Sequence, residues 1–159
     1  MPKVLFVCTA NICRSPMAEA LFRRQAAALN GDWQVASAGT WASRGLPAAR
    51  GAVEAMAARG LDLGEHRSRP VSEAALRDAD LVLTMTASHR EGIVLEFPFA
   101  AGRVHLLSEL SGKSYDVADP YGGTAAEYEA CAAELAGLIE AGAEAIVQRA
   151  SRNALGGAA

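Results

Sequence analysis

The 159-residue chain is long enough for one domain, and its hydrophobic fraction of 51% excludes an intrinsically disordered protein. A net charge of −3 lacks the basic excess of a nucleic-acid-binding protein, and no apolar run approaches the roughly 20 residues that cross a membrane. Three cysteines without a visible secretory signal favour a cytoplasmic protein with reduced thiols. We expect one domain over 1–150 and a frayed tail over 151–159.

The predicted elements alternate between strands and helices. Short apolar or alternating runs predict strands at 3–8, 33–37, 80–85 and 103–107. Helical spacing and capping residues predict helices that open at Ser15 and stop near 30–32, then at 48–59, 72–79, 86–97 and 124–149. Four strands that alternate with helices predict a three-layer α/β/α domain with a four-stranded parallel sheet. In such folds the site lies beyond the carboxyl ends of the strands.

The segment between the first strand and the first helix carries the strongest functional signal. Cys8 ends the buried strand, and Arg14 follows after five intervening residues. Because this loop wraps around the start of a helix, its backbone N–H groups and the Arg14 guanidinium can surround a phosphate. The same positive groups favour the thiolate of Cys8, a nucleophile aimed at phosphorus, and Ser15 can hydrogen-bond its sulfur. Cys8 alone would fit an ordinary buried strand end.

Residues 7–20, VCTANICRSPMAEA, resemble the signature loop of the low-molecular-weight protein tyrosine phosphatases. The likeness continues at residues 37–40, at His66, at 80–85 and at 119–121, and so covers nearly the whole chain. It implies a flavodoxin-like sheet with a phosphate-binding loop after strand 1. It also implies hydrolysis of phosphotyrosine in proteins through a phosphocysteine intermediate, without a cofactor. The expected partners are a phosphorylated protein and a cognate bacterial kinase.

The resemblance also implies roles for the residues that support the loop. The phosphate-binding and supporting positions carry over to Thr9, Ala10, Asn11, Ile12, Cys13, Ser15, Ser37 and His66. Asn11, Ser15, Ser37 and His66 would form the family's hydrogen-bond network, although His66 alone fits a surface histidine equally well. The family usually has glycine where Ala10 stands, and we infer that Asn11, not Ala10, takes the left-handed conformation. Cys13 fits either a redox guard that bonds to Cys8 or a packed core residue.

Expulsion of the substrate oxygen needs a proton donor, and two aspartates follow the fourth strand. Asp119 precedes Pro120, and Asp116 lies close by, so spacing alone leaves both open. The resemblance selects Asp119 as general acid and base and places Tyr121 in the wall of the cleft. The cysteines and histidines have no zinc-site spacing, and we expect no metal.

The sequence has features of two branches of the family, which act on different phosphorylated residues. Cys8-Thr9, Thr84-Met85-Thr86 and the run Asp-Pro-Tyr-Gly-Gly at 119–123 resemble the bacterial protein arginine phosphatases. Those enzymes carry threonine where this chain has Ile12, and an apolar wall there favours phosphotyrosine, with Trp41 as a candidate aromatic rim. An arsenate reductase would need further cysteines, which 76–100 lack, and a phosphocysteine carrier would need neither Arg14 nor Asp119.

Overall fold

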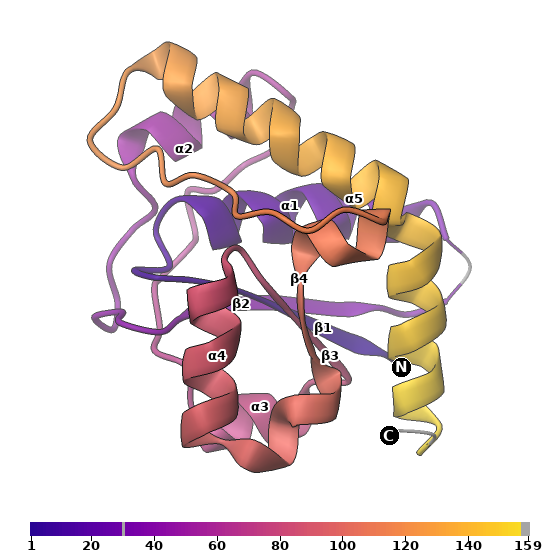
Figure 1. Ribbon diagram of the computed structural model, residues 1–159. Helices are drawn as coiled ribbons and strands as arrows, with labels where there is room; N and C mark the ends of the chain where they lie inside the picture. Colours follow the sequence, from indigo (N-terminus) through magenta and orange to yellow (C-terminus); the bar gives the residue numbers. More distant parts are fainter. Residues whose placement is uncertain (30, 157–159) are drawn as a thin grey trace.

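The computed structural model describes residues 1–29 and 31–156 of the chain. Four parallel strands form one sheet in the order β2-β1-β3-β4, where β1 is Lys3–Cys8, β2 is Gln34–Gly39, β3 is Leu81–Thr84 and β4 is Val104–Leu106. The helices α1 (Arg14–Ala27), α2 (Arg50–Ala57) and α5 (Ala125–Ala154) cover one face (Figure 1). The other face carries α3 (Glu73–Asp78) and α4 (Ala87–Glu96). This confirms the predicted α/β/α fold.

The central strand β1 explains why the sheet has two cores. Successive side chains of a strand point to opposite faces. Val4, Phe6 and Cys8 therefore pack under α1, α2 and α5, while Leu5 and Val7 pack against α3 and α4. A strand buried on both faces is apolar at every position, as the run 4–8 predicts.

The carboxyl ends of three neighbouring strands meet where the functional loop begins. Cys8 at the end of β1 pairs with Gly39 at the end of β2, and Val7 pairs with Thr84 at the end of β3. The sheet order changes direction between β1 and β3, and open α/β sheets bind ligands beyond the strands at such a point. The loops that follow β1 and β3 therefore lie side by side there.

Two predicted helix ends are wrong, each because a tertiary contact replaces a local one. α1 begins at Arg14 with Cys13 as its N-cap, so Ser15 lies inside the helix and its hydroxyl bonds to other side chains. α5 continues to Ala154, and residues 151–154 are not a frayed tail. Asn153 Nδ2 donates to the carbonyl oxygen of Asp80 at 2.8 Å and ties this end of the helix to the sheet.

Other boundaries differ by a few residues, and two short 3-10 helices, η1 (Pro98–Arg103) and η2 (Leu107–Ser111), were not predicted. The predicted N-cap Ser72 is confirmed, because its hydroxyl accepts from Ala75 N at 3.1 Å. Asn30 and the tail residues 157–159 lie outside the described residues.

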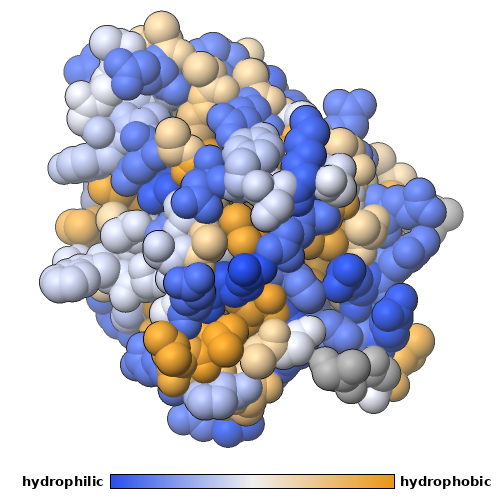
Figure 2. Space-filling view, in the orientation of Figure 1, coloured by the Kyte–Doolittle hydropathy of each residue, from blue (hydrophilic) through white to orange (hydrophobic). Residues whose placement is uncertain are grey.

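The surface in the view of Figure 1 is mostly hydrophilic, with apolar side chains gathered over α4, which carries the exposed Leu95 (Figure 2). Among the described residues, none of the helices is long and apolar enough to cross a membrane.

Candidate active site

The loop between β1 and α1 forms the floor of a cavity of about 350 Å³. The structure brings most of the predicted site residues together in its lining: Cys8, Thr9, Ala10, Ile12, Cys13, Arg14, Asp119 and Tyr121. Leu46, which no motif indicated, completes the wall. Trp41 does not line this cavity; it is 86% exposed and borders the neighbouring one, which also contains Thr9 and Arg14, so its place at the rim stays a prediction.

Gly39 lets the loop lie directly against β2. Thr40 N donates to Cys8 O and Trp41 N donates to Thr9 O, both at 2.9 Å. A Cβ on Gly39 would lie 2.3 Å from Thr9 O and 3.0 Å from Asn11 N. No real side chain tolerates the first distance, so glycine is required where the strand meets the loop.

We therefore expect Gly39→Ala to lower the free energy of unfolding by about 2–3 kcal/mol, because a backbone oxygen must move to admit the methyl group. Gly137→Ala is the control: Gly137 lies inside α5, and apart from the adjoining backbone of its own helix no atom lies within 4 Å of an added Cβ, so alanine should stabilise the protein by up to about 1 kcal/mol. Urea denaturation measures both. Equal effects of the two variants would contradict the close approach of loop and strand.

Asn11 is the left-handed residue of the loop, as expected. Its φ is 59°, and it is the only non-glycine residue with positive φ in the described part of the chain; Ala10 is not strained. The buried Asn11 side chain is fully bonded: Nδ2 donates to Ser15 Oγ at 2.7 Å and Ser37 Oγ at 2.9 Å, and Oδ1 accepts from Arg69 N at 3.0 Å. These bonds compensate the burial of its polar atoms.

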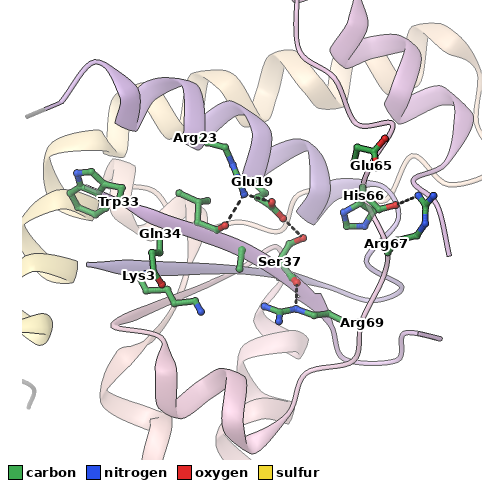
Figure 3. Close-up of a pocket in the computed structure, with 12 residues that line it drawn as sticks. Lys3, Glu19, Arg23, Trp33, Gln34, Ser37, Glu65, His66, Arg67 and Arg69 are labelled. Carbon is green, nitrogen blue, oxygen red and sulfur yellow. Dashed lines mark hydrogen bonds and ion pairs between the residues drawn. The ribbon is translucent and has the colours of Figure 1, made fainter. Parts of the chain in front are cut away.

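The hydrogen bonds run from Glu19 through Ser37 and Asn11 to Ser15, and the Glu19 carboxylate fixes the direction of each of them. The Glu19 carboxylate can only accept, so Ser37 Oγ donates to Glu19 Oε1, at 2.6 Å. Ser37 Oγ must then accept from Asn11 Nδ2. Figure 3 shows Glu19 and Arg23 of α1 beside Ser37 of β2, with Arg69 on the other side of the strand.

The inner end of the network makes Ser15 a donor toward the nucleophile. Ser15 Oγ accepts from Asn11 Nδ2 and keeps its own proton free. The nearest acceptor for that proton is Cys8 Sγ at 2.9 Å, while Ala38 O lies at 3.4 Å. A hydroxyl that donates to sulfur stabilises a thiolate more than a thiol.

His66 and Arg69 hold the outside of the loop. His66 Nε2 lies 2.7 Å from Asn11 O, and since a carbonyl only accepts, Nε2 carries the proton. Arg69 Nε donates to Ser37 O at 3.0 Å. Sequence reasoning missed Glu19 and Arg69. The spacing of Glu19, four residues after Ser15 and thus on the same helix face, was the available signal.

The Arg14 guanidinium is buried but only partly bonded. Nη1 donates to Val117 O at 2.9 Å, and Nη2 lies 3.4 Å from both Thr9 Oγ1 and Asp119 Oδ2. Nε is buried and has no hydrogen-bond partner among the described residues. A buried unpaired donor is costly, and it fits an anion oxygen bound in the cavity.

The three cysteines occupy different environments. Burial raises the pKa of the Cys13 thiol to about 11 and that of Cys131 to about 12, so both are protonated at neutral pH. Cys13 Sγ lies 3.5 Å from the Tyr128 hydroxyl, and Cys131 belongs to the buried face of α5 and packs in the core. Cys8 is the cysteine whose sulfur has a serine hydroxyl at 2.9 Å.

The two candidate aspartates have different partners. Asp119 lines the cavity, its side chain is 47% exposed, and its Oδ1 accepts from Tyr121 N at 3.1 Å. Asp116 does not line the cavity; its Oδ1 accepts from Ala87 N at the start of α4, at 2.9 Å. Gly122 has a φ of 77°, a backbone conformation that favours glycine in the turn after Tyr121.

Comparisons with known proteins agree on the family. A family model described as low molecular weight phosphotyrosine protein phosphatase matches residues 3–153. The chain is 38% identical to a probable low molecular weight protein-tyrosine-phosphatase, EpsP, of Ralstonia nicotianae, over 92% of this chain and 94% of that protein. It is 41% identical to a protein-arginine-phosphatase of Bacillus subtilis, over 86% and 91%.

A solved low molecular weight protein tyrosine phosphatase from T. tengcongensis has the same fold. Its TM-score is 0.87 at 43% identity, and the match covers 91% of this chain and 99% of the other. The family match spans nearly the whole chain, including the loop, the strands and the segment that contains Asp119. The chain belongs to the low molecular weight phosphotyrosine protein phosphatase family.

Proposed function

We propose that this protein hydrolyses phosphotyrosine in proteins, with Cys8 as nucleophile, Arg14 as phosphate clamp and Asp119 as general acid and base. One observation carries the proposal: the Cys8 sulfur, with Ser15 as its donor, lines the same cavity as a buried, partly unpaired guanidinium and a carboxyl group. Nucleophile, electrophilic clamp and acid are the three parts that this reaction needs.

In the first step the Cys8 thiolate attacks phosphorus, the S–P bond forms and the bond from phosphorus to the tyrosine oxygen breaks. The Asp119 carboxylic acid gives its proton to the leaving phenolate oxygen. Arg14 and the backbone N–H groups of the loop hold the negative oxygens of the phosphoryl group as it is transferred.

In the second step the Asp119 carboxylate takes a proton from water as the water oxygen attacks phosphorus. The P–S bond breaks, inorganic phosphate forms, and the electron pair returns to Cys8 as a thiolate. The Ser15 hydroxyl, 2.9 Å from the sulfur, stabilises this leaving group.

The wall of the cavity supports a phenyl substrate. Ile12, Leu46 and Tyr121 contribute apolar and aromatic surface to its lining. A flat aromatic ring buries more apolar area against such a wall than a charged guanidinium does. Overall identity does not separate the branches, because relatives named for phosphotyrosine and for phosphoarginine match at 38% and 41%. Phosphoarginine is therefore the second candidate substrate.

The test compares kcat/KM for phosphotyrosine and phosphoarginine peptides of one sequence. We expect the wild type to prefer phosphotyrosine, and Ile12→Thr to shift the ratio toward phosphoarginine by about tenfold, because a hydroxyl replaces apolar wall. Ile12→Val, which keeps a branched apolar side chain, is the matched control and should keep the wild-type ratio. A wild-type preference for phosphoarginine would overturn the substrate assignment, and no turnover of either peptide would overturn the reaction.

We further propose that the protein acts in the cytoplasm beside a cognate bacterial kinase. A thiolate nucleophile needs a reducing compartment, and a phosphotyrosine substrate needs a kinase that phosphorylates it there. The three cysteines are free thiols, as a reducing compartment requires.

A further inference from the structure

His89 lies beside the functional loop although no motif indicated it. It belongs to α4, which follows β3 at the point where the loops after β1 and β3 meet. The start of α4 is held firmly, since Thr86 Oγ1 accepts from His89 N at 3.2 Å and Asp116 Oδ1 accepts from Ala87 N at 2.9 Å. The histidine is only 7% exposed. Its ring therefore has a defined position against Thr9.

The two ring nitrogens of His89 differ sharply. Nε2 lies 2.8 Å from Thr9 Oγ1, whereas Nδ1 is buried and has no hydrogen-bond partner among the described residues. Burial and then the charge of Arg14 lower the pKa of His89 to about 4, against the opposing charges of Asp116 and Asp119, so the ring is neutral at neutral pH. A proton on Nδ1 would leave a buried donor unpaired. A proton on Nε2 has Thr9 as its acceptor, and this tautomer is favoured.

Thr9 Oγ1 then receives two N–H donors. One is His89 Nε2, and the other is Arg14 Nη2 at 3.4 Å. Because both lone pairs of the hydroxyl are occupied, the oxygen is fixed as an acceptor for Arg14. On the far side, Val117 O receives Nη1 at 2.9 Å, so the guanidinium is held at both ends.

We propose that His89 is a positioning residue that, through the Thr9 hydroxyl, fixes the Arg14 guanidinium in the orientation that receives the phosphoryl group. The proposal rests on the function proposed above, since it treats the loop as the phosphoryl site. A histidine that only filled space between α4 and the sheet would be replaceable by any side chain of similar size.

The test measures the affinity for inorganic phosphate by calorimetry together with kcat and KM for an aryl phosphate. We expect His89→Leu, which keeps bulk and removes Nε2, to weaken phosphate binding by about tenfold and to raise KM, with a smaller effect on kcat. His89→Gln, whose amide nitrogen can donate near the position of Nε2, should restore binding to within about twofold. In a Thr9→Val background, His89→Leu should have no further effect.

Ser88→Ala, on the same helix, is the control and should bind phosphate like the wild type. Equal losses in His89→Leu and His89→Gln, or losses that multiply with Thr9→Val, would show that the ring acts only by packing. If His89→Leu does not fold, His89→Met takes its place, since it also keeps bulk and lacks a donor: it should weaken phosphate binding by about tenfold, and binding like the wild type would overturn the proposal. Phosphate affinity needs no turnover, so failure of the proposed reaction would appear separately, as intact phosphate binding without hydrolysis.

Discussion

Replacement of Cys8 by serine is expected to abolish hydrolysis of aryl phosphates, with a loss of at least about 10⁴-fold in kcat. The hydroxyl of a serine at position 8 is almost fully protonated at neutral pH. The Ser15 hydroxyl donates to the Cys8 thiolate in the wild type, and the variant has no anion there for it to stabilise. The wild type should show a burst of released phenol followed by slower turnover, because a phosphocysteine forms and is then hydrolysed. Stopped-flow measurement of phenol release checks both expectations.

Cys131→Ala provides the matched control for this variant. Cys131 is also buried, but it belongs to the core-facing side of α5 and does not line the cavity. We expect it to lose some stability and to keep its turnover per folded molecule. Turnover by purified Cys8→Ser at a rate near that of wild type would exclude Cys8 as the nucleophile and, with it, the covalent mechanism.

The strands were predictable because burial leaves a simple trace in the sequence. β1 is buried on both faces, and its continuous apolar run therefore indicated a buried strand. The N-cap at Ser72 was predictable for a similar reason, since the hydroxyl satisfies a backbone donor three residues away. Both are properties that neighbouring residues decide.

Contacts between distant segments were not predictable in this way. Ser15 has the sequence context of an N-cap, yet its hydroxyl serves Cys8 and Asn11 inside the helix. The end of α5 has a small polar composition, but Asn153 bonds to Asp80 O, 73 positions earlier in the chain. In each case a tertiary hydrogen bond outweighed the local preference.

The candidate site shows the same division. The loop from Cys8 to Ser15 was recognisable because one short segment supplies both nucleophile and clamp. His89 lies 80 positions from Thr9, and nothing within its own helix indicates that its ring reaches the loop. Leu46 is a single apolar residue in a loop, and only the folded chain shows that it lines the cavity. Trp41, the candidate aromatic rim, lies outside this lining and borders the neighbouring cavity.

Asp119→Asn is expected to slow hydrolysis of phenyl phosphate by about 10²–10³-fold, because the amide cannot protonate the leaving phenolate. The variant keeps an acceptor for Tyr121 N and so preserves the turn. A leaving group that is already a weak base needs little protonation. For such substrates Asp119→Asn should slow formation of the phosphocysteine less. Pre-steady-state phenol release across a series of aryl phosphates measures this dependence, because it follows formation of the phosphocysteine alone.

Asp116→Asn separates the acid from its neighbour. Asp116 points to the start of α4, and its amide counterpart retains an acceptor for Ala87 N, so the control should react at nearly the wild-type rate with every leaving group. If Asp119→Asn slows phenol release equally for good and poor leaving groups, Asp119 supports the structure of its loop and is not the acid. A leaving-group dependence in Asp116→Asn would transfer the acid role there. We expect the rate loss to depend on the leaving group in Asp119→Asn, because Asp119, unlike Asp116, lines the same cavity as Cys8 and Arg14.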